Sequence, residues 1–233
     1  MEIIAEIGQN HNGDMKIAAE MIRRVKENGA DAAKFQVYDA KKLFPKIGNP
    51  WYEYNCKTEL SRDNVCFLAD ECRKSGIEFL ASVFDAERIT WLEEAGVKRY
   101  KVASRSINDK GLLNCLAETG KPLLVSLGMW SGKKFPDIRC SHKIDFLYCI
   151  SKYPTPLSDV KLSRVDFKLY SGFSDHTIGI STALTALARG ARIIEKHFTL
   201  DTSMYGPDHE SSMVPNELKT IDSFRRDLQE ILG

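Results

Sequence analysis

The sequence lacks a long basic tract, an apolar run of membrane-spanning length and any CxxC spacing among its six cysteines. Its 33 Lys and Arg residues nearly balance 32 Asp and Glu residues, so charge gives no bias toward nucleic acid or a membrane surface. The first residues, MEIIAEIG, carry a glutamate where a secretory signal needs an apolar run. We therefore expect a cytoplasmic globular protein with no nucleic-acid or membrane partner.

The cysteines show no metal or redox motif, and an even number of them does not imply disulfides in a reducing compartment. Cys149 lies in the apolar run IDFLYCI and is expected to be a small buried hydrophobic residue. The sequence also has no linker and no low-complexity stretch. We expect residues 1–233 to form a single domain.

Short apolar segments alternate with amphipathic, capped segments, a pattern typical of βα units around a parallel sheet. Eight segments have the character of strands: 3–7, 32–37, 79–83, 99–103, 123–127, 144–149, 169–173 and 193–197. Eight such segments, with starts mostly 20 to 29 residues apart, predict an α/β fold of the (β/α)8 TIM-barrel type rather than an open sheet.

Helix caps are expected at four short polar residues whose side chains can accept hydrogen bonds from the amides of a first turn. They are Asp14, Ser61, Asp85 and Asp109. Further helices are expected at 181–189 and 215–232, whereas the connections at 130–143 and 154–168 have too weak a helical pattern. The stretch 40–58, rich in aromatic residues and turn formers, is expected to be the longest loop and a lid over the barrel mouth.

Inward side chains alternate along barrel strands, and catalytic groups gather at the C-terminal strand ends. This rule selects a set of polar candidates: Glu6, Asn10, His11, Lys34, Gln36, Lys101, Ser104, Arg105, Ser126, Ser151, Tyr153, Ser174, His176, Glu195 and His197. Two inward lysines, Lys34 and Lys101, need an anion, because an ammonium ion withdrawn from water costs several kcal/mol. Glu6 or Glu195 could supply it, but the converging serines favour a bound phosphate or carboxylate.

Two histidines, His176 and His197, end the seventh and eighth predicted strands. Ends of neighbouring strands lie about 5 Å apart, so the two imidazoles could hold one Mn, Fe, Co or Zn ion acting as a Lewis acid. The alternative is two unrelated strand-end histidines. Asp208, in the tetrapeptide GPDH, could either form a turn or bind the hydroxyl groups of a polyhydroxylated ligand.

The segments IAEIGQNHNGD, GADAAKFQ, YKVAS, KPLLVSLGM, SKYPTP, GFSDHT, IIEKHFTLD and GPDH occur in order along nearly the whole chain. In these segments the chain resembles the sialic acid synthase family, which includes N-acetylneuraminate, legionaminate and pseudaminate synthases. The resemblance implies a transferase that condenses phosphoenolpyruvate with an open-chain N-acetylated hexose, similar to N-acetylmannosamine. The products would be phosphate and a nonulosonic, sialic-type acid.

The resemblance also implies roles for individual residues. The phosphoenolpyruvate contacts would be Lys34, Lys101, Ser104, Ser126, Ser151 and Ser174; the sugar contacts Glu6, Gln36, Tyr153 and Asp208; and the metal ligands, usually for manganese, His176 and His197. Glu195 would lie beside the metal. Glu6, Glu195, Lys34 and Lys101 are thus the catalytic candidates, and the group that handles the proton of the attacking water is left open between Glu6, Glu195 and metal-bound water.

Two departures from the family pattern bear on substrate and partners. The chain reads Ser104-Arg105-Ser106 where the family usually has a glutamate, so we expect that a contact to the sugar, or to a residue that supports the sugar site, is lost and that a phosphate contact is gained. It ends at Gly233, without the antifreeze-like domain that closes the partner's active site in the family. We expect a homodimer, with that domain supplied by a separate chain, dispensable, or lost with a change of substrate.

Two other functions remain open from the sequence. One is a phosphoenolpyruvate-dependent 3-deoxy-ulosonate synthase, of the octulosonate or arabino-heptulosonate type, in which Arg105, Lys41 and Lys42 hold a second phosphate. The other is an inactive barrel that binds a sugar or a regulatory partner. The presence of both histidines and both lysines weighs against the inactive barrel.

Overall fold

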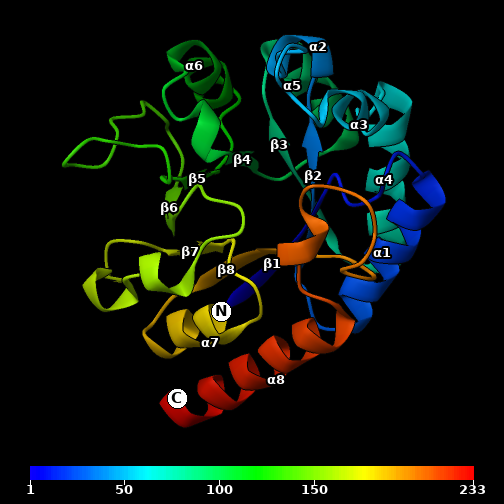
Figure 1. The fold of residues 1–233 in the computed structure, drawn as a ribbon. Coiled ribbons are helices and arrows are strands. Elements are labelled where there is room, and N and C mark those ends of the chain that lie inside the picture. The colour runs from blue at the N-terminus through cyan, green and yellow to red at the C-terminus, as the bar shows by residue number, and fades with distance from the viewer.

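A closed barrel of eight parallel strands forms the centre of the computed structural model, which describes residues 1–233 (Figure 1). Each strand pairs with the next in the chain, and the eighth pairs with the first. The strands are β1 (Glu2–Gly8), β2 (Ala32–Val37), β3 (Glu78–Val83), β4 (Tyr100–Val102), β5 (Leu123–Ser126), β6 (Ile144–Cys149), β7 (Gly172–Asp175) and β8 (Ile193–His197). The predicted (β/α)8 barrel is confirmed.

The seventh strand lies further along the chain than the sequence predicts. A strand is expected at 169–173, but the amides of Leu169 and Tyr170 both donate to the carbonyl of Asp166, which closes a turn there. Leu169 is 63% exposed and belongs to no strand. β7 begins at Gly172 and ends at Asp175, so its last two residues, Ser174 and Asp175, directly precede the candidate His176.

Gly172 sets how closely β7 approaches β8. A Cβ atom at this position would lie 2.0 Å from the carbonyl oxygen of Ile193, a distance that no side chain can adopt. Only glycine therefore allows this pairing of the two strands, whose C-terminal ends carry the candidate metal ligands.

Helices cover most of the outside of the barrel (Figure 1). They are α1 (Met15–Glu27), α2 (Ala40–Leu43), α3 (Tyr52–Lys57), α4 (Arg62–Ser75), α5 (Ala86–Ala95), α6 (Lys110–Glu118), α7 (Ser181–Ala188) and α8 (Pro215–Leu232). All four predicted caps accept amide hydrogen bonds from the first turn of their helix. None of these helices combines the length and the apolar character needed to cross a membrane.

The two weak connections contain no α-helix, as predicted. The chain between β5 and β6 is irregular, and the chain between β6 and β7 has only the 3-10 turns η2 (Leu157–Asp159) and η3 (Leu162–Arg164). Figure 1 shows loops in place of helices beside β6. The barrel therefore has an incomplete outer ring on this side.

The stretch 40–58 is not the long loop that the sequence suggested, because it contains α2 and α3. Asp39 caps α2 by accepting hydrogen bonds from the amides of Lys41 and Lys42. Buried Tyr54 and Asn55 anchor α3 against the body of the protein. The expectation of an irregular segment was wrong because helices of four and six residues give almost no periodic signal.

Inside the barrel, one layer of apolar side chains fills the lower half. It consists of Ile4, Ala32, Leu80, Leu124, Leu147 and Ile193. Below this layer, Arg99 bridges Glu2 and Glu78 at 3.0 and 2.9 Å across the N-terminal end of the barrel. The polar residues of the upper half therefore lie in a cup that is closed from below.

Candidate active site

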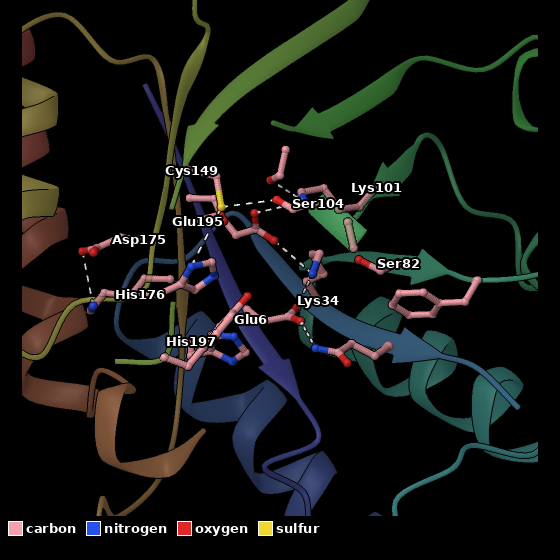
Figure 2. Close-up of a pocket in the computed structure, with 17 residues that line it drawn as sticks. Glu6, Lys34, Ser82, Lys101, Ser104, Cys149, Asp175, His176, Glu195 and His197 are labelled. Carbon is pink, nitrogen blue, oxygen red and sulfur yellow. Dashed lines mark hydrogen bonds and ion pairs between the residues drawn. The ribbon is translucent and has the colours of Figure 1, made fainter. Parts of the chain in front are cut away.

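An inner pocket lies above the apolar layer, at the C-terminal end of the barrel (Figure 2). Each of the eight strands contributes at least one polar side chain or thiol to its lining. The predicted residues that line it are Glu6, Lys34, Gln36, Lys101, Ser104, Ser126, Tyr153, Ser174, His176, Glu195 and His197. Closure of the barrel by the pairing of β1 with β8 brings together residues from opposite ends of the chain, since Glu6 lies opposite His197 in that pairing and both line this pocket.

Four buried charges form one chain of ion pairs across the pocket floor. Lys34 Nζ lies 2.6 Å from Glu6 and 2.9 Å from Glu195, and Lys101 Nζ lies 3.3 Å from the second oxygen of Glu195. Lys101 also donates to Ser126 Oγ at 2.7 Å. Both expected anions for the lysines are therefore present in the protein itself, and Glu195 is shared between them.

The environment moves the pKa values of these groups in different directions. Burial opposes the charge of Lys34, but Glu195 and Glu6 outweigh it and raise the pKa of that ammonium. Burial, reinforced by Lys34, lowers the pKa of Lys101. Burial also opposes the charge of Glu195, but Lys101 and Lys34 together hold its pKa well below the usual range. Two ammonium and two carboxylate groups give the floor no net charge.

Serine hydroxyls lie beside this charged floor. Ser104 Oγ accepts from the amide of Gly128 at 3.1 Å and contacts Cys149 Sγ at 3.4 Å. Ser151 lies higher, where it lines only the outer pocket and its Oγ has no hydrogen-bond partner. A Cβ atom on Gly128 would come within 2.5 Å of Ser151 Oγ, so glycine is required for the serines to gather here. The predicted serine set is thus divided between two levels.

His176 and His197 lie side by side with ring centroids 5.8 Å apart, and Figure 2 shows both rings directed into the pocket. His176 Nδ1 lies 2.9 Å from the carbonyl oxygen of Ile150, which fixes the ring and leaves Nε2 available. His197 Nδ1 is buried without a hydrogen-bond partner and lies 3.9 Å from Asp208 Oδ2. Burial lowers the pKa of His197 although Asp208 opposes the shift, which favours the neutral form of the ring.

This pair fits part of a metal site. Two imidazoles bound to one ion at about 2.1 Å keep their centroids within about 6.5 Å of each other, and the observed separation meets that limit. A neutral, orphaned ring nitrogen is also the form that binds a metal. No three His, Cys, Asp or Glu side chains come close enough to form a complete set of ligands. Other positions on the ion would have to be taken by water or substrate oxygens.

An outer pocket of about 450 Å³ opens above the inner one and shares six lining residues with it: Gln36, Phe84, Ala103, Ser104, Tyr153 and His197. Its further lining consists of Gln9, Phe44, Asn49, Trp51, Asn55, Arg105, Met129, Ser151, Pro207 and Asp208. Residues of the segment 40–58 therefore do lie over the barrel mouth. The volume is within the range of small-molecule sites.

Other predicted residues lie elsewhere, and some lining residues were missed. Asn10 and His11 are buried outside both pockets, and Asn10 bonds Phe198 and Ser212 instead. Cys149 is buried as expected, but it lines the inner pocket, 3.9 Å from His176 Nδ1. Ser82 also lines it, with no partner for its hydroxyl. Both follow an inward leucine by two positions, so strand alternation was the signal that could have found them.

The expected second phosphate site on α2 is not formed. Lys41 and Lys42 are exposed and line neither pocket, and Lys42 lies 3.5 Å from Asp39. Arg105 is the one member of that set that lines the outer pocket.

The sequence and the structure of this chain are similar to those of several known proteins. A sequence model described as the NeuB family matches residues 21–233. N,N'-diacetyllegionaminic acid synthase of Legionella pneumophila is 37% identical over 99% of this chain and 73% of its own. N-acetylneuraminate-9-phosphate synthase of Homo sapiens is 34% identical over 99% of this chain and 71% of its own. The crystal structure of N-acetylneuraminic acid synthetase from Leptospira borgpetersenii, in complex with citrate, has a TM-score of 0.89 and 33% identity, covering 99% of this chain and 84% of that one.

Proposed function

The chain belongs to the NeuB family, the family of the sialic acid synthases, and on that premise we propose that it condenses phosphoenolpyruvate with an open-chain N-acetylated hexose. The products are a nonulosonic acid and inorganic phosphate. The observation that carries the proposal is the pair of buried lysines, Lys34 and Lys101, which meet around Glu195 at the floor of a polar pocket.

Phosphoenolpyruvate binds in the inner pocket, where the ammonium groups of Lys34 and Lys101 and the hydroxyls of Ser104, Ser126 and Ser174 face its phosphate and carboxylate. Ser151, at the higher level, contacts the part of the ligand nearer the mouth. Because the floor already contains two carboxylates, it cannot neutralise a multiply charged anion by itself. Additional positive charge is needed beside it.

His176 and His197 supply the place for that charge, because they would hold a divalent metal ion such as manganese. When bound, such an ion polarises the aldehyde oxygen of the sugar. The carbonyl of Ile150 orients His176, and the ring of Tyr153, 4.1 Å from it between centroids, covers its face. These contacts hold the His176 ring in place before any ligand arrives.

The sugar binds in the outer pocket, with its aldehyde directed down toward the inner one. Gln36 is held there by its hydrogen bond to Glu6 at 2.9 Å, and Tyr153 and Asp208 stand on the wall. Amide, phenol and carboxylate groups suit the hydroxyls and the acetamido group of such a sugar. Glu6 touches the sugar from below, through the shared part of the two pockets.

In the reaction, C3 of the enol forms a bond to the aldehyde carbon, water adds at C2, and the C2–O bond breaks to release phosphate. The protein holds the two reacting carbons together and excludes bulk water from the buried floor. Glu6 and Glu195, the two carboxylates paired with the lysines of the floor, are the groups proposed to accept the proton of the attacking water.

The proposal is tested by measuring phosphate release from phosphoenolpyruvate in the presence of Mn²⁺ and a panel of aldehydes. The panel contains N-acetylmannosamine, diacetamido-hexoses, arabinose 5-phosphate and erythrose 4-phosphate. We expect release with at least one N-acetylated hexose and a product detected as a nonulosonic acid by mass spectrometry. Release with arabinose or erythrose phosphate alone would instead establish a 3-deoxy-ulosonate synthase, and no release with any aldehyde would support the inactive barrel.

A further inference from the structure

Asn12 joins two segments that line the outer pocket, although it lines neither pocket itself. It lies in the turn that follows β1, and its side-chain oxygen accepts a hydrogen bond from the hydroxyl of Tyr54 at 2.6 Å. The same oxygen lies 3.2 Å from Nε2 of His209. Tyr54 belongs to α3, and His209 directly follows Asp208, so one amide oxygen connects α3 to the turn after β8.

Both of these segments contribute to the lining of the outer pocket. α3 and the residue before it supply Asn55 and Trp51, and the turn after β8 supplies Pro207 and Asp208. Asp208 is the one carboxylate in that lining, and its Oδ2 lies 3.9 Å from Nδ1 of His197. A shift of the turn would therefore move the carboxylate that is proposed to contact the sugar.

His209 anchors this turn through both of its ring nitrogens. Its side chain is completely buried, and burial lowers its pKa, which favours a neutral ring with one N–H group. Because the Asn12 oxygen can only accept, the N–H group lies at Nε2 and donates to Asn12. Nδ1 then accepts from the hydroxyl of Thr199, which is 2.7 Å away. The ring is thus held from two sides, and Asn12 provides one of them.

The backbone near Asn12 fits this role. Asn12 is the only residue other than glycine with a φ in the left-handed region, at +54°, a conformation that asparagine tolerates better than most residues. The turn also rests directly on the two partners of Asn12. A Cβ atom on Gly206 would lie 2.5 Å from the hydroxyl oxygen of Tyr54 and 2.8 Å from the His209 ring. The Asn12 oxygen therefore fixes the two side chains on which the Asp208 turn is seated.

We infer that Asn12 is a positioning residue for the sugar: by accepting hydrogen bonds from Tyr54 and His209, it holds the turn that places Asp208 in the outer pocket. The inference rests on the proposed function, in which Asp208 contacts the sugar, and adds a residue that acts through that contact. Loss of the Asn12 oxygen should therefore impair use of the sugar. Binding of phosphoenolpyruvate and of the metal ion in the inner pocket should not change, since Asn12 does not line that pocket.

Three substitutions separate the oxygen of Asn12 from its backbone conformation. Asn12→Gly keeps the left-handed conformation and removes the oxygen, whereas Asn12→Asp keeps both. Tyr54→Phe removes one of the two donors and leaves Asn12 in place. The matched control is Asn28→Gly, because Asn28 is half-buried like Asn12 but lies at the end of α1 and lines neither pocket.

The readouts are kcat and KM for phosphoenolpyruvate and for the N-acetylated hexose that supports phosphate release, with Mn²⁺ binding followed by electron paramagnetic resonance. Asn12→Gly removes the acceptor of both donors, so we expect kcat/KM for the sugar to fall by about 3- to 30-fold. KM for phosphoenolpyruvate and Mn²⁺ binding should stay at their wild-type values. Tyr54→Phe should lose less than Asn12→Gly, Asn12→Asp should recover most of the loss, and Asn28→Gly should behave as the wild type does.

A double variant tests whether Asn12 acts through Asp208. If it does, Asp208→Asn lowers kcat/KM for the sugar by a smaller factor in the Asn12→Gly protein than in the wild type. Two losses that simply multiply would show that Asn12 does not act through Asp208 and would overturn the inference. Should urea unfolding show that Asn12→Gly does not fold, Tyr54→Phe, which removes a single hydroxyl, serves in the same comparison.

The remaining outcomes separate this inference from the function it rests on. An unchanged kcat/KM for the sugar in Asn12→Gly, or an equal loss for the sugar and phosphoenolpyruvate, would overturn the positioning role while leaving the synthase intact. Failure of every N-acetylated hexose to release phosphate with the wild-type protein would overturn both.

Discussion

Lys196 and Asp175 form an ion pair, with Nζ 3.2 Å from Oδ2, in which both side chains are completely shielded from solvent. Each residue directly precedes one of the site histidines, His197 and His176, and side chains alternate across a strand. The pair therefore lies behind the imidazoles, and Figure 2 shows Asp175 pointing away from them. It ties β7 to β8 at the point where the spacing of the two rings is set.

Replacing one member of this pair should destabilise the protein strongly. Lys196→Met leaves the Asp175 carboxylate buried without its counter-ion, and removing one partner of a buried pair costs about 3 to 5 kcal/mol. We expect a loss of that size in the free energy of unfolding, measured with urea at pH 7.

A double variant separates charge from packing. Asp175→Asn keeps the acceptor that binds the amide of Thr177 at 2.9 Å, so combining it with Lys196→Met leaves a neutral contact of similar shape. The double variant should lose clearly less stability than Lys196→Met alone. Lys152→Met, which breaks the exposed pair with Asp159, should change the free energy of unfolding by less than about 1 kcal/mol. Equal losses in the single and double variants would show that the charges are not coupled.

Lys101→Ala should weaken phosphoenolpyruvate binding. The variant removes the ammonium group that donates to Ser126 and faces Glu195, so the anion loses one charged contact worth about 1.5 to 3 kcal/mol. We expect KM for phosphoenolpyruvate to rise by about 10- to 150-fold in steady-state assays. Lys152→Ala serves as the surface control. A change confined to the KM of the sugar would contradict the assignment.

His197→Ala should abolish metal-dependent turnover without unfolding the barrel. The ring nitrogen removed is one that has no partner within the protein, so its loss leaves no other group unsatisfied. Wild-type activity should disappear with EDTA and return with Mn²⁺, whereas the variant should recover neither activity nor Mn²⁺ binding, followed by electron paramagnetic resonance. His142→Ala, at an exposed position, should behave as the wild type does. Turnover that persists in EDTA would refute the metal role.

His11 should make the fold sensitive to acid. The side chain is fully buried, its Nε2 has no partner, and burial lowers its pKa to about 4. Since the unfolded chain binds a proton near pH 6.5, the folded state is at full stability above that pH. It loses about 3 kcal/mol as the pH falls from 6.5 to about 4.

The variant His11→Asn tests this dependence, because Asn can still accept the hydrogen bond that His11 Nδ1 receives from the amide of Gly13 at 3.1 Å. Its free energy of unfolding, measured in urea at several values between pH 7 and 4, should fall less steeply than that of the wild type. His142→Asn should keep the wild-type slope. An unchanged slope in His11→Asn would assign the acid sensitivity to other groups.

Much of the fold can be predicted from the sequence because its signals are local. Strand alternation and capping side chains act within a few residues, so they correctly indicate the number of strands, the positions of seven of them, the four caps and the two helix-free connections. They miss the start of β7 because the turn at Asp166 depends on backbone hydrogen bonds that apolar Leu169 and Tyr170 conceal. They miss the helices α2 and α3 because these have only four and six residues.

The sequence predicts which residues line the site, but not which of them contact each other. Alternation indicates that Lys34, Lys101 and Glu195 point inward, yet which carboxylate each lysine meets depends on strand register around the closed barrel. The same limit hides Lys196, which alternation places outside the barrel but which packing leaves fully buried. The division into inner and outer pockets also depends on strand lengths and loops, which is why Ser151 is separated from the other serines.

The bridge from Arg99 to Glu2 and Glu78, together with the six apolar side chains above it, closes the N-terminal end of the barrel and leaves its C-terminal end as the entrance. A ligand of the inner pocket must therefore enter and leave through the outer pocket. A ligand in the outer pocket therefore blocks the exit of a ligand in the inner pocket. The ligand that binds last must leave first.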